Sequence, residues 1–165
     1  MDQFVKNFRE TIQLASERLS QISEEESAKA LAGGKWSSKE IIGHLIDSAS
    51  NNHSRFVRAQ LESDLVFPGY DQEKWVAIQR YGDEPWAQLI ALWKHYNLHL
   101  SHLILISNET SRRQPRATHN LDRIAFKSVA GDEPATLEFF MRDYVDHLRH
   151  HLRQIFDGMP PRQDQ

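Results

Sequence analysis

The sequence predicts an all-α protein built as a four-helix bundle. Apolar residues recur every three or four positions in four long segments, and the period-two alternation typical of exposed strands is scarce throughout. One long polar connection, at residues 107–134, is of the kind that crosses a bundle from one helix to the next. The chain has 165 residues, which is enough for a single core, and we assign residues 1–165 to one domain.

The first helix is predicted over about 20 residues at the N-terminus, because an apolar stripe with helical spacing runs along it. The residues of this stripe are Phe4, Phe8, Thr11, Ala15, Leu19 and Ile22.

The second helix begins in "WSSKEIIGHL", where Ser37 or Ser38 can accept a hydrogen bond from the first free amide groups. It is expected to continue to about Ser63, because the stretch "FPGYD" then interrupts helical structure. A short helical piece is expected at residues 73–79.

The third helix starts near Glu84 and Pro85, since proline is favoured in a first turn. Its inward residues are Leu89, Trp93, Tyr96, Leu100 and Leu103. The polar segment 107–134 follows, and a connection of that length in a small domain is more often functional than idle. The fourth helix begins near Thr136 and ends before Gly158 and the pair Pro160 and Pro161, which form a stop signal.

Composition excludes several classes of protein. The net charge of −3 does not suggest a nucleic-acid-binding surface. Cysteine is absent, which excludes disulfides, thiolate zinc ligands and a cysteine nucleophile. No apolar run reaches the ~18 residues of a transmembrane helix, and the N-terminus lacks the pattern of a signal peptide, so we expect a cytoplasmic protein without membrane association.

The stretch "DHLRHHLRQI", at residues 146–155, holds three of the nine histidines. At about 100° per residue, His147 and His151 lie in one narrow sector that faces the core together with Phe140 and Tyr144, whereas His150 points to another side. Two histidines one turn apart on a helical face can hold one metal ion. The alternative is a pair of core histidines satisfied by hydrogen bonds.

His44 is the best candidate for a third ligand, although it lies on a flank of its helix. The apolar centre of that helix is formed by Ile42, Leu45, Ala49 and Phe56. The polar residues that share the flank are Asp47, Ser48, Asn51 and Arg55. This flank is either a solvated stripe or the polar wall of a pocket, and in the second interpretation these four residues contact a substrate.

Two stretches carry a resemblance to a known family. "KWSSKEIIGHLIDSASNNHSRF" and "DYVDHLRHHLRQI" resemble the second-helix and fourth-helix motifs of the DinB/YfiT-like superfamily. The resemblance covers nearly the whole chain and implies an up-down-down-up four-helix bundle. It also implies that His44, His147 and His151 bind a divalent metal, whereas His150 is an additional histidine that the family does not use as a ligand.

Three neutral imidazoles leave a coordination position for water or substrate, and Zn, Ni, Fe or Mn can occupy such a site. Family members similar to this chain are thiol S-transferases that attach small thiols such as bacillithiol to electrophiles. The resemblance therefore implies a homodimeric transferase whose partners are a small-molecule thiol and an electrophile. The alternatives are a non-catalytic metal-binding protein associated with stress and a metal-dependent hydrolase.

Several further residues have two interpretations. Asp47 and Asp143 lie one turn from a ligand and either orient it or are exposed. Asn97 either makes a buried polar contact near the metal or lies at the bundle edge. The arginines of "SRRQPR" either bind an anionic group of the thiol or are solvated. The remaining candidates, expected at the surface, in loops or in packing, are His53, His95, His99, His102 and His119.

Overall fold

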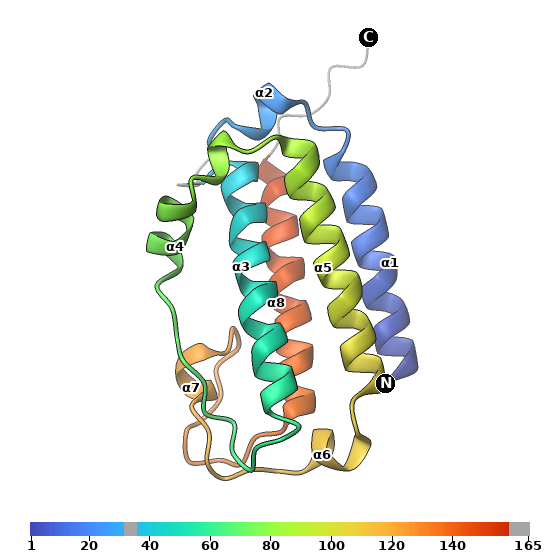
Figure 1. Cartoon of the computed structure of the whole chain (residues 1–165), viewed down its shortest axis with the longest axis vertical. Coiled ribbons are helices and arrows are strands. Elements are labelled where there is room, and N and C mark those ends of the chain that lie inside the picture. The colour runs from blue at the N-terminus through green and yellow to red at the C-terminus, as the bar shows by residue number, and fades with distance from the viewer. Residues whose placement is uncertain (32–35, 159–165) are drawn as a thin grey trace.

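Four long helices pack side by side in the computed structural model (Figure 1). The structure describes residues 1–31 and 36–158, and these contain helices but no β-strand. The long helices are α1 (Asp2–Leu19), α3 (Ser38–Arg58), α5 (Trp86–Ile106) and α8 (Leu137–Gly158). The predicted all-α four-helix bundle is thus confirmed. The predicted stop at Pro160 and Pro161 lies outside the described residues.

The helices α1 and α8 run in one direction and α3 and α5 in the other (Figure 1), which confirms the up-down-down-up order. Because α3 and α5 are parallel, their connection must return along the whole bundle. This connection contains α4 (Gln72–Gln79), close to the short helix predicted at 73–79, and the 3₁₀ turn η1 (Tyr81–Asp83).

The prediction of a single long crossover at residues 107–134 is therefore wrong. That segment joins the antiparallel helices α5 and α8 at one end of the bundle, and it contains α6 (Glu109–Arg113) and α7 (Leu121–Ile124). The remaining short helix, α2 (Glu24–Ser27), lies between α1 and α3. Periodicity could not predict helices of four or five residues, because they span little more than one turn.

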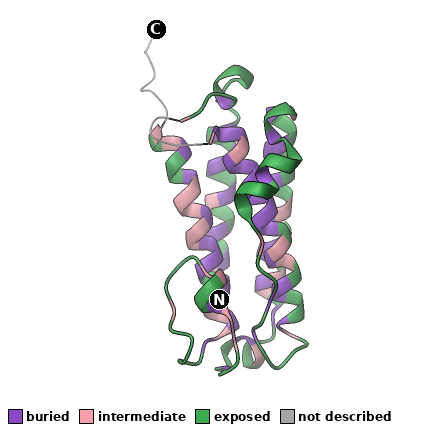
Figure 2. Ribbon diagram, turned by 90° about the vertical axis from the view of Figure 1, so that its left-hand side faces the viewer, coloured by how far each residue is buried: buried purple, intermediate pink, exposed green. Residues whose placement is uncertain are grey.

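Each long helix turns one stripe of buried residues toward its neighbours (Figure 2). On α1 the buried stripe runs through Val5 and Ile12, whereas the predicted members Phe4 and Thr11 are only half-buried. The stripe is thus rotated by part of a turn from the prediction. The residues that α1 buries are Val5, Phe8, Ile12, Ala15, Ser16 and Leu19.

The start of α3 matches the prediction, but its end does not. Ser37 accepts a hydrogen bond from the backbone N–H of Glu40, and the Glu40 side chain accepts one from the backbone N–H of Ser37. The helix ends at Arg58 rather than near Ser63. Just beyond it, Leu65 pairs its backbone with Thr118 and Asn120 at 3.0 and 3.2 Å, and this contact holds the chain in an extended conformation.

Candidate metal centre

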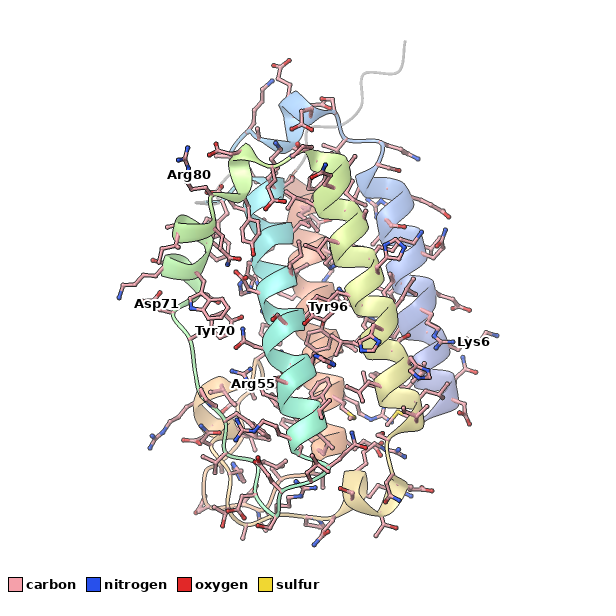
Figure 3. The ribbon with its side chains drawn as sticks, in the orientation of Figure 1. Lys6, Arg55, Tyr70, Asp71, Arg80 and Tyr96 are labelled. Carbon is pink, nitrogen blue, oxygen red and sulfur yellow. The ribbon has the colours of Figure 1, made fainter. Side chains whose placement is uncertain are left out.

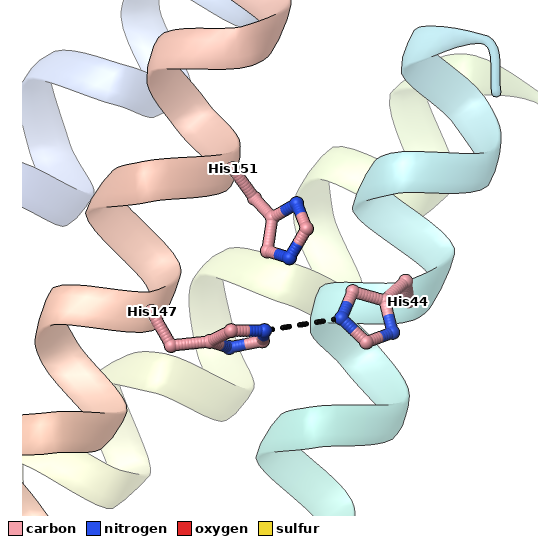
Figure 4. Close-up of side chains that lie close together, drawn as sticks. All are labelled: His44, His147 and His151. Atoms are coloured by element: carbon pink, nitrogen blue, oxygen red, sulfur yellow. Dashed lines mark hydrogen bonds between the residues drawn. The ribbon is translucent and has the colours of Figure 1, made fainter. Parts of the chain in front are cut away.

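Three histidines from two helices meet at one point of the bundle (Figure 4). The Nε2 atoms of His44 on α3 and His147 on α8 are 3.2 Å apart. The ring of His151, one turn further along α8, lies 4.8 Å from the His44 ring and 4.5 Å from the His147 ring. Each residue offers one ligand atom, and these atoms all lie within 4.8 Å of one another.

Burial keeps the three imidazoles neutral. Burial, together with the smaller effect of the charge that a neighbouring histidine would carry, lowers the pKa of His44 to about 3 and that of His147 to about 2. The pKa of His151 is lowered by the same cause, although its hydrogen bond to Gln154 opposes the shift. A neutral imidazole has a free lone pair, so the donor set fits a divalent metal ion.

The surroundings of His151 orient its ring. Its Nδ1 lies 2.7 Å from Oε1 of Gln154, which leaves Nε2 directed to the other two rings. A hydrogen bond at the second ring nitrogen is the usual way in which proteins fix a metal-binding histidine. His150 lies outside the group, where its ring contacts Phe126 and its Nε2 lies 3.1 Å from Gln154. Helical periodicity does not predict this role for Gln154.

The metal-free protein is expected to lose stability as the pH falls below 6.5. His44 is 1% exposed and has a lowered pKa in the folded state, so below its ordinary pKa the unfolded chain takes up the proton more readily. Each such histidine should lower the free energy of unfolding by about 1.4 kcal/mol per pH unit between its two pKa values. Urea unfolding at several pH values measures the slope. The change in the free energy of unfolding per pH unit should be smaller in His44→Gln. An unchanged slope in that variant would contradict the lowered pKa of His44 in the folded protein.

A cavity of about 350 Å³ opens beside His44 and His147. Its walls come from α3, from α8 and from both long connections, at residues 69–72 and 123–126. Part of the polar flank of the second helix lines this cavity, which agrees with its interpretation as the wall of a pocket, and the 107–134 segment forms another wall. The wall at residues 69–72 was not expected, because "FPGYD" showed only an interruption of helical structure.

Two of the four predicted substrate contacts, Ser48 and Arg55, line this cavity, whereas Asp47 and Asn51 do not. The Asp47 carboxylate accepts hydrogen bonds from the Tyr81 hydroxyl and the Gln79 amide, both at 2.7 Å. Asn51 donates to the backbone oxygen of Asp47 at 2.9 Å. Asp47 thus lies on the side of α3 that faces α4 and η1, whereas the Asn51 side chain bonds back to its own helix.

Asn52 and Tyr70 line the cavity and were not predicted. At 100° per residue, His44, Ser48, Asn52 and Arg55 form one stripe along α3. The spacing of four residues from Ser48 could have indicated Asn52. Tyr70 belongs to an irregular segment, where no periodicity exists to place it.

The carboxylate of Asp143 stabilises a wall of the cavity and does not orient one of the candidate metal-binding histidines. Its two oxygens accept hydrogen bonds from the backbone N–H groups of Phe126, at 2.8 Å, and Lys127, at 2.7 Å. Asp47 likewise binds Tyr81 and Gln79, so the suggestion that these carboxylates orient the histidines is not supported. Asp143 instead ties the 107–134 segment to the helix that carries His147 and His151.

Asn97 makes the buried polar contact that was one of its two interpretations. It is fully buried and accepts a hydrogen bond at 2.6 Å from the hydroxyl of Tyr144, whose side chain lines the cavity. His119 is a loop residue that contacts the backbone oxygen of Glu133 at 2.7 Å.

The arginines of "SRRQPR" do not reach the cavity. Arg112 pairs with Glu138 at 3.2 Å, and Arg116 donates to backbone oxygens that include those of Glu62 and Ser111. Arg112 and Arg116 are buried and stabilise the end of the bundle, so neither the anion-binding nor the solvated interpretation holds for them. Arg113 is exposed and pairs with Glu109 at 2.9 Å, which agrees with the solvated interpretation.

His53 and His99 pack against each other across α3 and α5, with ring centroids 5.1 Å apart, which agrees with their expected role at the surface or in packing. His53 follows His44 by nine residues on α3, and at 100° per residue it lies on the opposite face of that helix, away from the candidate centre. Among the described residues, only the group of His44, His147 and His151 brings three ligand atoms together.

No helix in the described ranges combines the length and the hydropathy that are needed to span a bilayer.

Comparisons with known proteins agree with this architecture. The chain is 33% identical over 63 residues to "Putative metal-dependent hydrolase OB0413" from Oceanobacillus iheyensis, a match that covers 38% of this chain and 36% of that protein. The chain thus matches about a third of the length of this curated relative.

The fold is similar to that of YfiT from Bacillus subtilis, described as a probable metal-dependent hydrolase with an unusual four-helix bundle topology. The TM-score is 0.76 at 18% identity, and the similarity covers 94% of this chain and 83% of YfiT. The family model of the DinB superfamily matches residues 7–155, a range that includes all three histidines of the candidate centre. The chain therefore belongs to the DinB superfamily.

Proposed function

We propose that the protein is a metal-dependent transferase that joins a low-molecular-weight thiol to an electrophile. One observation carries this proposal: three neutral histidines converge beside a cavity of about 350 Å³ instead of being enclosed by packed side chains. Sites with three protein ligands and an accessible fourth position are typical of catalysis, whereas structural zinc sites are closed by four ligands.

The donor set supports a divalent ion held by His44, His147 and His151. The candidates are Zn, Ni, Fe and Mn, since imidazole suits several of these metals. Such an ion, when bound, lowers the pKa of a coordinated thiol or water and thereby supplies a nucleophile at neutral pH. Because the chain has no cysteine, the reacting thiol has to come from a small molecule.

The walls of the cavity suit a small molecule with polar groups. Phe126 covers one side of His147, with ring centroids 5.4 Å apart, and Phe140 and Tyr144 continue the aromatic wall along α8. Ser48 and Arg55 supply a hydroxyl and a guanidinium on the opposite wall. The lining is thus mixed, with aromatic faces that can contact the carbon skeleton of a ligand and polar groups that can fix its orientation.

A metal-dependent hydrolase is the second candidate, because both proteins in the comparisons are named as such. A hydrolase also needs a general base near the attacking water. The carboxylate that lines the cavity belongs to Asp143, and both of its oxygens already accept backbone hydrogen bonds. This engagement favours a thiol, which ionises more readily than water, as the nucleophile.

We expect the metal-loaded protein to accelerate the reaction of a small thiol with 1-chloro-2,4-dinitrobenzene. The thiol loses its proton, a sulfur–carbon bond forms and the carbon–chlorine bond breaks with release of chloride. Chelation should lower the rate by about 100-fold or more, because a metal contributes several kcal/mol of charge stabilisation. Cysteine, coenzyme A, bacillithiol and glutathione are the thiols to compare.

The same preparation should be assayed with p-nitrophenyl esters in the absence of thiol. Metal-dependent ester hydrolysis without thiol transfer would establish the hydrolase instead. If neither reaction exceeds the rate without protein while the metal remains bound, the protein is a non-catalytic metal binder.

A further inference from the structure

The cavity contains a buried positive charge without a counter-ion. Arg55 is 6% exposed, and its Nη2 donates to the backbone oxygen of Pro68 at 2.8 Å. Within residues 1–31 and 36–158, no carboxylate forms an ion pair with Arg55, and burial lowers the pKa of its guanidinium. An unpaired buried charge is strongly unfavourable, so this arrangement points to a missing anion.

The other charged side chains that line the cavity do not supply this anion. Asp143 is occupied by the backbone N–H groups of Phe126 and Lys127. The other charged side chain, Arg123, is itself a cation; it is 79% exposed and lies 3.5 Å from Asp122. Arg55 is thus a buried charge of the cavity that lacks an oppositely charged partner among the described residues.

The immediate neighbours of Arg55 are neutral. Its Cζ lies 5.9 Å from the centre of the Tyr70 ring and 6.0 Å from that of Phe140. Figure 3 labels Arg55 on α3 and Tyr70 on the segment that leads to α4. Burial raises the pKa of Tyr70 to about 12, so its phenol remains a neutral hydrogen-bond donor.

The guanidinium lies at a distance from the histidines. Phe140, which it approaches, precedes His147 by seven residues on α8, or about 10 Å along the helix at 1.5 Å per residue. On α3, Ser48 and Asn52 occupy the stripe between His44 and Arg55, and both line the cavity. A ligand that reaches from the histidines to Arg55 therefore passes these two polar side chains.

We propose that Arg55 and Tyr70 form a carboxylate-binding subsite, and that the substrate thiol carries one carboxylate about 10 Å from its sulfur. A single guanidinium among neutral groups balances one negative charge, whereas a doubly charged phosphate would leave an excess. Guanidinium groups also match the planar carboxylate with paired hydrogen bonds. That the end of the substrate opposite the carboxylate is a thiol rests on the proposed function.

Calorimetric titration of the zinc-loaded protein tests this proposal with straight-chain ω-mercaptocarboxylates and ω-mercaptoalcohols of matched length. The acid should bind about 10- to 100-fold more tightly than the alcohol, because hydrogen bonds to a charged group are among the stronger ones. Arg55→Met should abolish this preference and leave the alcohol unaffected, and Arg55→Lys should keep part of it. Arg58→Met is the matched control, since this exposed arginine lies one turn away and pairs with Glu62 at 3.0 Å.

Each outcome separates the subsite from the proposed function. Equal affinity for acid and alcohol in the unmodified protein would overturn the subsite, whatever the chemistry at the histidines. Tighter binding of an ω-mercaptoalkyl phosphate than of the carboxylate would overturn the choice of a carboxylate. If thiols bind no better than their sulfur-free analogues while plain carboxylates still bind through Arg55, the proposed function fails and the subsite stands. Should Arg55→Met not fold, the acid-to-alcohol ratio in the unmodified protein and in Arg55→Lys decides.

Discussion

Replacing His44, His147 or His151 with alanine is expected to weaken metal binding by about 100- to 1000-fold in each case. The estimate follows because metal sites with four ligands contribute on the order of 10–16 kcal/mol, or roughly 3–4 kcal/mol per ligand. The remaining two imidazoles cannot compensate, since no other described histidine, aspartate or glutamate joins their group. Metal content after dialysis and calorimetric affinity measure the loss.

His150→Ala and His53→Ala are the controls, and both should retain one tightly bound metal ion. His150 is the stricter control, because its ring lies only 5.2 Å from that of His151. If His150→Ala loses the metal as fully as His151→Ala does, the choice between these adjacent histidines is wrong.

Gly43→Ala is expected to destabilise the protein by about 3 kcal/mol and to disturb the adjacent ligand His44. A Cβ atom at this position would overlap the ring of Tyr81, which crosses α3 there and is 3% exposed. Because the ring would have to move, its hydrogen bond to Asp47 would be lost and a buried carboxylate would lose a partner. Urea unfolding gives the change in stability, and metal titration gives the effect on the site.

Gly82→Ala provides the matched control, because Gly82 follows Tyr81 directly and a Cβ atom there would meet nothing within 4 Å. Its stability should stay within about 1 kcal/mol of the unmodified protein. If Gly43→Ala and Gly82→Ala are equally stable, the close packing of the Tyr81 ring against Gly43 does not contribute to the stability of the protein.

The features that repeat along a helix could be predicted from the sequence. The four long helices, the cap at Ser37 and the paired positions of His147 and His151 all follow from spacing or from local hydrogen bonding. The third ligand, His44, did not follow from periodicity, because it lies on a polar flank. It depended on the resemblance to a family.

The polar lining of the cavity was predicted only in part, for a physical reason. The buried stripe of α3 has polar residues on both sides, and spacing does not show which side faces another helix. Ser48 and Arg55 lie toward α8, whereas Asp47 faces α4. The choice between these sides depends on where the connections 59–85 and 107–134 pack, and irregular segments have no period from which to place them.

Contacts between distant segments were also beyond prediction. Lys39 is 4% exposed and pairs with Glu24, whose other oxygen accepts the backbone N–H of Trp86 at 2.8 Å. Lysine and glutamate usually occur at the surface, so neither residue type indicated that α2 would join the starts of α3 and α5.

The separation of 103 positions between His44 and His147 has a consequence for how the protein acquires its metal. A growing chain exposes α3 long before α8 has been synthesised, so early intermediates hold a single imidazole of the three. Binding of one ion by all three imidazoles requires the docking of α8 against α3, a contact of high sequence separation. An ion held there binds only the assembled bundle, so it shifts the folding equilibrium and opposes the separation of these two helices.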